Sequence, residues 1–306
     1  MYVEYLYGLF SALLLIVAIN TNSLIISGLS LWVSLSLFLV FIAYLTNQPK
    51  IFRKRSNGSI PFFTRTMFYP FMVGVQFYNF LQKRSDHKKD RHYIHLIEDD
   101  IYLASRLSVE EAMALDQYNI KAILDVTAEF DALDWSSRYL DIDYLNIPIL
   151  DHRSPTPKQL RQALNWIDSQ RRQNKPIIVH CALGRGRSLF CVAAYLLAKN
   201  PSKNVDEVLN QITSIRLQAG LNKNQRKKLT KFQHNDELVL LNPAWLIANP
   251  MSGQQKWQVH RREIETQLGQ HFNLNVVETT EQKNGQDWGQ EASENGAKFI
   301  FAAGGD

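Results

Sequence analysis

A long stretch without charge near the N-terminus constrains this chain more than any other feature of its sequence. No Asp, Glu, Lys, Arg or His occurs in residues 5–49. As one continuous helix the stretch would measure about 68 Å, whereas the hydrocarbon core of a bilayer is about 30 Å thick. Polar residues at 20–23 divide it into apolar runs over 5–19 and 24–45. The sequence therefore predicts a transmembrane helical hairpin over residues 1–49, in which the longer second run is the stronger candidate for a span.

The alternative for this stretch is a cleaved secretory signal peptide. The chain begins with an acidic residue, Glu4, and no basic one, and it shows no small-residue pattern of a cleavage site. Its two cysteines, Cys181 and Cys191, form no disulfide framework and fit a reducing compartment. We therefore expect an integral membrane protein whose remaining residues lie on the cytoplasmic side. The basic residues after the second run, a flank normally retained in the cytoplasm, are Lys50, Arg53, Lys54 and Arg55.

Residues 50–92 are predicted to form a basic and aromatic juxtamembrane linker. The segment 60–81 is rich in Phe, Tyr and Met, but Pro61, Arg65 and Pro70 interrupt it, which argues against a third span. This segment either lies at the membrane interface or packs as an ordinary linker on the next domain. The basic side chains that follow are solvated by default, but near a membrane each adds up to about 1 kcal/mol of attraction to anionic headgroups. They are Lys83, Arg84, Lys88, Lys89 and Arg91.

From about residue 97 onward, short apolar runs alternate with amphipathic stretches. This pattern is typical of an α/β domain, in which helices flank a central sheet. The net charge of +5, from 34 basic and 29 acidic residues, is too small to indicate a nucleic-acid partner. Strands are expected over 101–104, 122–126, 144–149 and 176–180. Helices are expected over 109–117, 157–172, 188–198 and 205–215.

One segment of this domain has the features of a phosphate cradle. An apolar strand that ends at His180 is followed by a glycine-containing loop and an apolar helix. Gly184 and Gly186 allow successive backbone N–H groups to converge on one anion, and the helix N-terminus adds partial positive charge. These donors also favour the thiolate form of Cys181, and Arg187 can bind two phosphate oxygens with its planar guanidinium. The predicted phosphate-binding residues are Ala182, Leu183, Gly184, Arg185 and Gly186.

The order Cys181, five residues, Arg187 and Ser188, with His180 on the strand before it, resembles the signature of the dual-specificity branch of the protein tyrosine phosphatases. The resemblance covers about residues 97–232 and implies the dual-specificity phosphatase fold. Further matching segments are IYLAS at 101–105, KAILDV at 121–126 and IPILD at 147–151.

The resemblance implies a phosphoric monoester hydrolase that needs neither metal nor cofactor. The Cys181 thiolate would attack phosphorus to give a cysteinyl-phosphate while Asp151 protonates the leaving oxygen, and Asp151 would then activate water. Arg187 and the loop amides would stabilise the equatorial oxygens throughout. In this family the hydroxyl at the position of Ser188 helps the sulfur to depart, and His180 is expected to orient the loop.

Alternatives to these assignments remain open in the sequence. Asp151 holds the family position of the general acid, but Asp141 and Asp143 lie close by, and each of the three is alternatively a solvated turn residue. Cys191 lies within the apolar helix and is expected to be a small core residue. A catalytically silent phosphate-binding module would typically lack Cys181 or Arg187, and this chain has both.

The substrate is either a phosphorylated lipid or a phosphoprotein. Arg185 is an additional cation in the loop, at a position where the mitochondrial phosphatidylglycerophosphate phosphatase also has arginine and phosphoinositide phosphatases often have lysine. Alternatively, this side chain faces outward and carries no specificity. Anchoring in a membrane raises the local concentration of lipid headgroups, so we expect a lipid phosphate of the phosphatidylglycerophosphate or phosphoinositide kind ahead of phosphotyrosine, phosphoserine or phosphothreonine.

The C-terminal segment resembles the start of a second family, the diacylglycerol and sphingosine kinase catalytic domain. Its features are an apolar strand at 244–248 leading into NPMSG, a helix at 259–268, a strand at 274–277 and the final KFIFAAGGD. The expected nucleotide-binding residues are Asn249, Ser252, Gly253, Gly304, Gly305 and Asp306.

This kinase resemblance covers only the N-terminal part of that domain, so kinase activity is not expected here. ATP and Mg would be needed only by a complete form, a bifunctional fusion. A plain turn that caps a helix and a structural appendage are the alternatives for the segment. The expected domains are the hairpin at 1–49, the linker at 50–92, the phosphatase domain at 93–236 and the incomplete kinase-like domain at 237–306.

Overall fold

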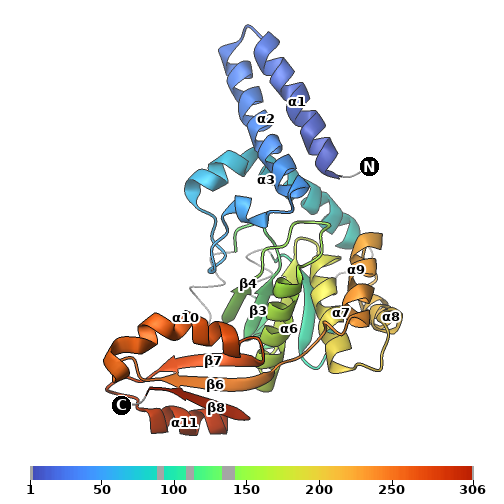
Figure 1. Cartoon of the computed structure of the whole chain (residues 1–306). Helices are drawn as coiled ribbons and strands as arrows, with labels where there is room; N and C mark the ends of the chain where they lie inside the picture. Colours follow the sequence, from blue (N-terminus) through green and yellow to red (C-terminus); the bar gives the residue numbers. More distant parts are fainter. Residues whose placement is uncertain (1–2, 88–92, 108–113, 133–141, 305–306) are drawn as a thin grey trace. The chain divides into compact units, whose positions relative to one another are not determined.

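The computed structural model describes residues 3–87, 93–107, 114–132 and 142–304. Contacts between residues divide the chain into two compact units, which are described separately (Figure 1). The first comprises Met1–Ala163 with Lys175–Leu238, and the second comprises Leu164–Asn174 with Val239–Asp306.

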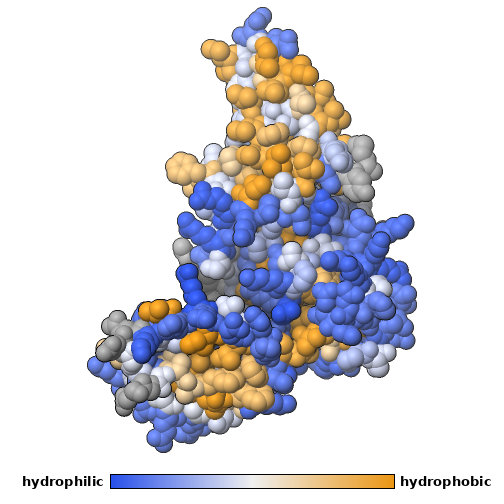
Figure 2. Space-filling model, viewed as in Figure 1, coloured by the Kyte–Doolittle hydropathy of each residue, from blue (hydrophilic) through white to orange (hydrophobic). Residues whose placement is uncertain are grey.

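Two apolar helices form the predicted N-terminal hairpin. α1 (Val3–Asn20) and α2 (Leu24–Leu45) are each long and apolar enough to cross a membrane. Between them, Ser11 Oγ donates to the Ser34 carbonyl oxygen at 2.9 Å, and Ser34 Oγ donates to the Ser11 carbonyl oxygen at 2.8 Å. Apolar side chains dominate the outer surface of the hairpin (Figure 2). Ser11 and Ser34 therefore pair between the two helices of the hairpin.

A third long helix follows the short turn η1 (Pro49–Phe52). α3 (Phe62–His87) runs through Pro70, although the sequence indicated an interruption there. Proline cannot donate to the carbonyl four residues earlier, and in α3 that carbonyl belongs to Thr66. Trp32 Nε1 of α2 donates to the Thr66 carbonyl oxygen at 3.2 Å instead. A contact from a neighbouring helix thus replaces the hydrogen bond that Pro70 cannot make.

The central sheet of the first unit has the strand order β1-β2-β5-β3-β4. β1 (Ile94–Glu98), which the sequence analysis did not anticipate, is antiparallel to β2 (Ile101–Ser105). The other three are parallel to β2, so their carboxyl ends meet at one edge of the sheet. They are β3 (Ala122–Asp125), β4 (Asp143–Asn146) and β5 (Ile177–Cys181).

β4 is shorter than the strand expected over 144–149. It ends at Asn146, although Ile147 and Ile149 are buried. Pro148 lacks the N–H group that a strand donates to its neighbour, so the extended segment leaves the sheet while its apolar side chains stay in the core. The expected helix over 109–117 lies largely outside the described residues, and its end is the short turn η2 (Ala114–Tyr118).

The helices expected over 157–172, 188–198 and 205–215 are present with nearly the same bounds. Every residue of α7 (Arg187–Lys199) from 187 to 197 is buried, and α7 packs on β5 and β2. α8 and α9 each begin with a capping box, at Asn204 and Asn222. The other helices are α8 (Val205–Ile215), α9 (Lys223–His234) and α6 (Pro157–Arg172), whose residues from Leu164 onward are counted with the second unit.

The second unit is a small parallel sheet with the strand order β7-β6-β8 and two helices. Its core contains Leu246, Ala248 and Trp257. The helix α11, which the sequence analysis did not anticipate, begins with a capping box formed by Asn284 and Asp287. The elements are β6 (Asn242–Ala248), η3 (Ser252–Gln255), α10 (Lys256–Leu268), β7 (Phe272–Glu278), α11 (Gly285–Glu294) and β8 (Phe299–Ala303).

Candidate active site

The predicted nucleophile lies where the parallel strands end. Cys181 is the last residue of β5, between β2 and β3, and is only 3% exposed. Ser188, in the first turn of α7, donates from its hydroxyl to Cys181 Sγ at 3.2 Å. In parallel sheets ligands bind at this carboxyl edge, and here the thiol also faces the start of a helix.

The loop between β5 and α7 is fixed from behind through its carbonyl oxygens. The Ala182 carbonyl accepts from Arg106 N at 3.1 Å, and the Arg185 carbonyl accepts from Gly220 N at 3.0 Å. Arg216 donates from Nε to the Gly184 carbonyl at 2.9 Å and from its NH2 group to the Leu183 carbonyl at 3.1 Å.

In a planar trans peptide the N–H group points opposite to the carbonyl. The N–H groups of residues 183–186 follow these four carbonyls in the chain. They therefore point away from the groups that bind the carbonyls, which are the Arg216 side chain and the backbone N–H groups of Arg106 and Gly220. Gly184 has a φ of +65°, and a Cβ there would lie 2.4 Å from the Ala104 carbonyl oxygen. Only glycine fits position 184, and the orientation of these peptide planes leaves consecutive N–H groups on the side away from the partners of the carbonyls.

Arg187 is held in a buried ion pair that the sequence analysis did not identify. Its two terminal nitrogens donate to the Glu129 carboxylate at 2.9 and 2.7 Å, and one of them also donates to the Ile149 carbonyl at 2.8 Å. Burial alone would lower the pKa of Arg187, but Glu129 and Asp151 raise it well above its ordinary value. Arg187 Nε has no hydrogen-bond partner among the described residues. The guanidinium is thus charged and fixed, with one donor available.

Asp151 lies beside Arg187, at the position the sequence predicts for the general acid. Its Oδ1 is 3.2 Å from an Arg187 terminal nitrogen and accepts from the His152 backbone N–H at 3.0 Å. Burial would raise the pKa of Asp151, but Arg187 and His152 outweigh it and lower the pKa. Asp143 pairs with Lys175 at the opposite end of β4, and Asp141 lies outside the described residues. Of the two described candidates, Asp151 and Asp143, only Asp151 lies beside Arg187, where a general acid is needed.

A buried polar network supports the strand next to Cys181. Asp125, at the end of β3, accepts from Lys54 Nζ at 2.7 Å and from the Tyr144 hydroxyl at 2.8 Å. The Lys54 and Asp125 side chains are each 1% exposed. Burial lowers the pKa of His180, and the charges of Lys54 and Arg106 lower it further. Asp125, 4.0 Å away, opposes this shift but does not cancel it. The lowered pKa favours a neutral ring. Lys54, one of the basic residues that follow the second apolar run, is part of this network.

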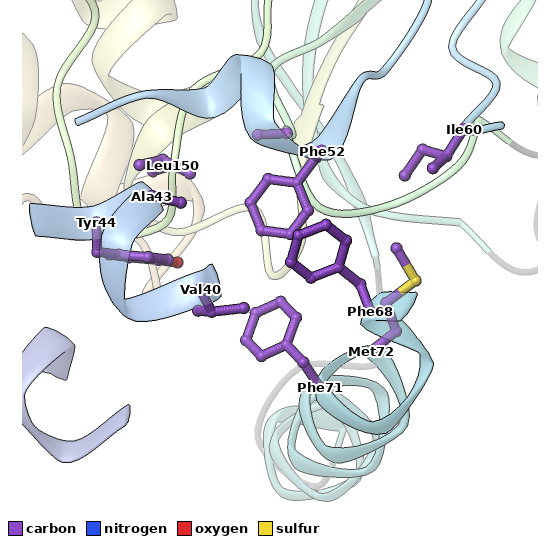
Figure 3. Packing of buried hydrophobic residues seen from close by; sticks show 10 residues of the cluster. Val40, Ala43, Tyr44, Phe52, Ile60, Phe68, Phe71, Met72 and Leu150 are labelled. Carbon is purple, nitrogen blue, oxygen red and sulfur yellow. The ribbon is translucent and has the colours of Figure 1, made fainter. Parts of the chain in front are cut away.

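The segment around Asp151 contacts both helices of the hairpin. Arg153 donates to Glu4 Oε1 at 3.0 Å and to the Tyr44 carbonyl oxygen at 2.8 Å. Leu150 belongs to the buried cluster shown in Figure 3, together with Ala43 and Tyr44 of α2. The ends of α1 and α2 therefore take part in positioning residues 150–153.

Two further predicted residues have defined surroundings. The Arg185 guanidinium lies 3.3 and 3.4 Å from Gln82 Oε1, near the end of α3. Cys191 is fully buried in α7, and burial together with Cys181 raises its pKa to about 12. Arg185 thus links the loop to α3, and Cys191 is a core residue, as expected.

The structure brings three of the predicted kinase-like residues together in the second unit. Gly304 follows β8 and has a φ of +146°. A Cβ there would lie 2.8 Å from Ser252 Oγ and 3.0 Å from Asn249 Cβ. Gly253 has a φ of +57° in the turn after β6. These residues meet at the carboxyl ends of β6 and β8, whereas Gly305 and Asp306 lie outside the described residues.

Several contributors to the site are separated from the loop in sequence. Glu129 follows the end of a buried parallel strand, which is the signal that would have found it. For Arg216 the sequence offers only a basic residue directly after an apolar helix, which does not indicate a contact with the loop.

Two protein families match this chain. Residues 101–235 match the family described as dual specificity phosphatase, catalytic domain, and residues 243–306 match the diacylglycerol kinase catalytic domain. These matches confirm both predicted resemblances and the α/β fold class.

Curated relatives match the first of these regions. "Dual specificity protein phosphatase Mpk3" of Drosophila melanogaster is 32% identical over 105 residues, which cover 34% of this chain and 25% of the relative. "Phosphatidylglycerophosphate phosphatase PTPMT2" of Arabidopsis thaliana is 29% identical over 121 residues, 39% of this chain and 53% of the relative. This chain thus matches a quarter to a half of the length of these relatives.

Solved structures also resemble part of this chain. The crystal structure of DUSP15 is 24% identical with a TM-score of 0.41, covering 47% of this chain and 89% of that chain. The structure titled "Crystal Structure of PTPMT1 in complex with PI(5)P" is 19% identical with a TM-score of 0.41, covering 47% and 96%.

Proposed function

Because residues 101–235 carry a dual-specificity phosphatase catalytic domain, we propose that this chain is a membrane-anchored phosphatase that hydrolyses phosphomonoesters through a cysteinyl-phosphate intermediate. One observation carries the proposal: Cys181 Sγ lies beside the Ser188 hydroxyl, with the loop carbonyls bound from behind and Arg187 fixed by Glu129. The proposed domains are 1–49, 50–92, 93–236 and 237–306.

In the first step the Cys181 thiolate attacks phosphorus. An S–P bond forms, the P–O bond to the leaving group breaks, and Asp151 donates its proton to the leaving oxygen. The loop amides and Arg187 bind the equatorial oxygens, whose negative charge they stabilise. The negative charge of a bound phosphate offsets the effect of Arg187 on Asp151 and so favours the protonated carboxyl that this step needs.

In the second step water hydrolyses the cysteinyl-phosphate. Asp151, now ionised, accepts a proton from the water, a P–O bond forms, and the S–P bond breaks. The Ser188 hydroxyl, at 3.2 Å from Cys181 Sγ, stabilises the departing thiolate by hydrogen bonding. His180, neutral at the end of β5, orients the loop. The reaction requires neither metal nor cofactor.

The preferred substrate class is a lipid phosphomonoester, of the phosphatidylglycerophosphate or phosphoinositide kind. Two apolar helices long enough to span a membrane support it, as does a relative named for phosphatidylglycerophosphate. Arg185 adds a cation beside the loop. The second candidate is a phosphoprotein, which the name of the Drosophila relative favours. In either case the catalytic domain lies on the cytoplasmic side, because basic residues follow α2.

The full chain in lipid nanodiscs tests the proposal. We expect release of inorganic phosphate from phosphatidylglycerophosphate, loss of turnover in Cys181→Ser, and near-normal turnover in the control Cys191→Ala. Turnover of phosphotyrosine peptides without any on lipid would overturn the lipid assignment. Full activity of Cys181→Ser would overturn the nucleophile.

A second activity is proposed for the kinase-like residues in a complete, bifunctional form of the protein. The contact of Gly304 with Asn249 and Ser252 at the carboxyl ends of two parallel strands suits a nucleotide phosphate, and ATP with Mg would be required there. Calorimetric titration of a form that carries the complete kinase domain with Mg-ATP tests this. Equal heats for that form and its Gly304→Val variant would contradict it.

A further inference from the structure

The helix α3 has two apolar faces. One face is buried: Phe68, Phe71 and Met72 pack with Val40 of α2 and with Phe52 of η1 (Figure 3). Thr64 and Val75 extend this face with the spacing of a helix. The buried face explains how α3 is held, but it accounts for only part of the apolar side chains of the helix.

The opposite face of α3 exposes a stripe of large apolar side chains. From Tyr69 to Leu81 most of its members recur at intervals of three and four residues, and every member is 45% to 85% exposed. Apolar patches of this extent on the surface of a protein mark an interaction site. The members of this aromatic stripe are Phe62, Phe63, Tyr69, Val73, Phe77, Tyr78, Phe80 and Leu81.

The aromatic stripe continues the apolar outer surface of α2. Trp32 of α2 stacks on Tyr69 with a centroid distance of 6.2 Å and an interplanar angle of 2°. Leu31, next to Trp32 in sequence, and Leu35, about one helical turn later, are each about half exposed. A medium or partner that contacts this surface of α2 therefore also contacts the aromatic stripe. Aromatic side chains of this kind gather where a membrane protein meets the bilayer interface.

The charge around α3 is complementary to anionic lipid. Residues 50–85 contain seven basic side chains and no acidic one. Of these, Lys54 is buried in its ion pair, whereas Lys50, Arg53, Arg55 and Arg84 are exposed. Basic residues beside an exposed apolar helix face are typical of helices that lie on a membrane.

We infer that α3 contacts the bilayer that holds α1 and α2, with the aromatic stripe against lipid. The lipid contact of α3 extends the proposed function. Its consequence for catalysis rests on that proposed function, whereas the contact itself does not. Gln82, one residue beyond the end of the stripe, contacts Arg185 of the phosphate-binding loop at 3.3 Å. A lipid-bound α3 thus places the loop beside the lipid headgroups, where a phosphomonoester is reached without leaving the membrane.

Site-directed labels measure the lipid contact directly. The full chain in a Cys181→Ser background receives one new cysteine, Tyr69→Cys or Phe77→Cys on the stripe, and is reconstituted in vesicles of phosphatidylcholine and phosphatidylglycerol. The remaining Cys191 is fully buried. Nitroxide-labelled acyl chains should quench a fluorophore at both positions as strongly as at Leu31→Cys on α2. A label at Lys223→Cys on α9 is the control and should keep its fluorescence.

Quenching at positions 69 and 77 no greater than at 223 would overturn the inference. That result, with the labels still shielded from an aqueous quencher, would indicate a protein partner on the stripe instead. This readout is independent of phosphatase activity, so a chain that is quenched yet inactive would refute the proposed function alone.

The catalytic consequence has its own measurement. Phe77→Asp should lower the ratio of turnover on a lipid phosphomonoester in vesicles to turnover on a soluble aryl phosphate by about tenfold or more, because a charged side chain is excluded from the bilayer. The matched variant Gln76→Asp changes charge beside the stripe and should lower the ratio less. An unchanged ratio in Phe77→Asp would show that the stripe does not deliver substrate.

Discussion

At the scale of single residues, the other charges of the site are arranged around the guanidinium of Arg187. Glu129 binds both of its terminal nitrogens, and Asp151 lies against one of them. Paired with Glu129, the guanidinium keeps its orientation without a ligand, so a phosphate meets a donor that is already in place.

Glu129→Gln tests this pair. The variant keeps the shape of the side chain but removes the charge opposite Arg187, and both side chains are almost fully buried, at 3% and 1% exposed. Breaking such a pair costs about 3–5 kcal/mol, so we expect a clear drop in Tm and in kcat/KM. Asp206→Asn, in the exposed pair with Arg226, is the control and should cost at most about 1 kcal/mol. Equal melting temperatures for the two variants would contradict the role of Glu129.

Asp151→Asn tests the general acid through the pH profile. Because the pKa of Asp151 is lowered, its proton is lost at lower pH than from a free aspartate, so kcat/KM should fall as pH rises past that pKa. The variant should lose about 10²–10⁴-fold in rate and lose this alkaline limb. Asp143→Asn removes the carboxylate paired with Lys175 and should change neither. An alkaline limb that persists in Asp151→Asn would rule out Asp151 as the acid.

Residues of the site that are close together in the sequence can be predicted from it, whereas distant ones cannot. Cys181, Gly184, Arg187 and Ser188 lie within one short segment, so their spacing alone indicates the chemistry. Glu129 acts on the same guanidinium from 58 positions away, and in the sequence only its place shortly after the buried strand β3 marks it. Charges that meet only through the fold were missed for this reason.

At the scale of elements, the phosphate-binding loop depends on the end of α8. Arg216 donates to the carbonyls of Gly184 and Leu183 in the loop. Its Nη1 lies 2.7 Å from His95 Nδ1. The side chain is 5% exposed, so water does not substitute for it. Arg216 thereby fixes which way the amides of the loop point.

Arg216→Lys tests this support. Lysine has no planar fork and cannot bind the carbonyls of Leu183 and Gly184 together, so the loop amides lose their common direction. A hydrogen bond to a charged group contributes about 1.5–3 kcal/mol, and we expect inorganic phosphate to inhibit the variant at least about tenfold more weakly. Arg226→Lys on the exposed surface of α9 is the control. Unchanged inhibition in Arg216→Lys would show that the loop holds its shape without this side chain.

The hairpin supports the segment that carries Asp151. Arg153→Ala removes the contacts with Glu4 and with the Tyr44 carbonyl, so Asp151 should be displaced. Misplacing a catalytic group by about 1 Å costs up to about 100-fold in rate. An alkyl phosphate, whose leaving group needs a proton, should lose far more than an aryl phosphate with a good leaving group. Glu4→Gln keeps the Tyr44 contact and should have an intermediate effect; equal losses on both substrates in Arg153→Ala would indicate a purely structural defect.

Elements were predicted from sequence where their own residues decide the structure. The apolar periodicity of α7 and the capping residues of α8 are local, and both helices were predicted within two residues of their bounds. α3 continues through Pro70, where Trp32 of another helix donates to the Thr66 carbonyl that Pro70 cannot reach, and no local pattern predicts this tertiary contact. β4 ends at Asn146, two residues before Pro148, although the apolar side chains that follow stay buried.

At the scale of the whole molecule, the chain joins an apolar hairpin, a phosphatase domain and a kinase-like segment. Contacts of Arg153 with the hairpin and of Lys54 with Asp125 make the N-terminal residues part of the first unit rather than a detached anchor. The proposed reaction therefore depends on residues that the sequence analysis had assigned only to membrane attachment.

The most direct test of the account is a search for phosphate bound to Cys181. The full chain is mixed with an aryl phosphate that has a good leaving group, stopped in acid within milliseconds, digested and analysed by mass spectrometry. We expect a phosphoryl group on the peptide that contains Cys181, in greater amount in Asp151→Asn because the second step lacks its base, and none in Cys181→Ser. Steady turnover without any phosphoryl group on that peptide, or turnover by Cys181→Ser, would contradict it.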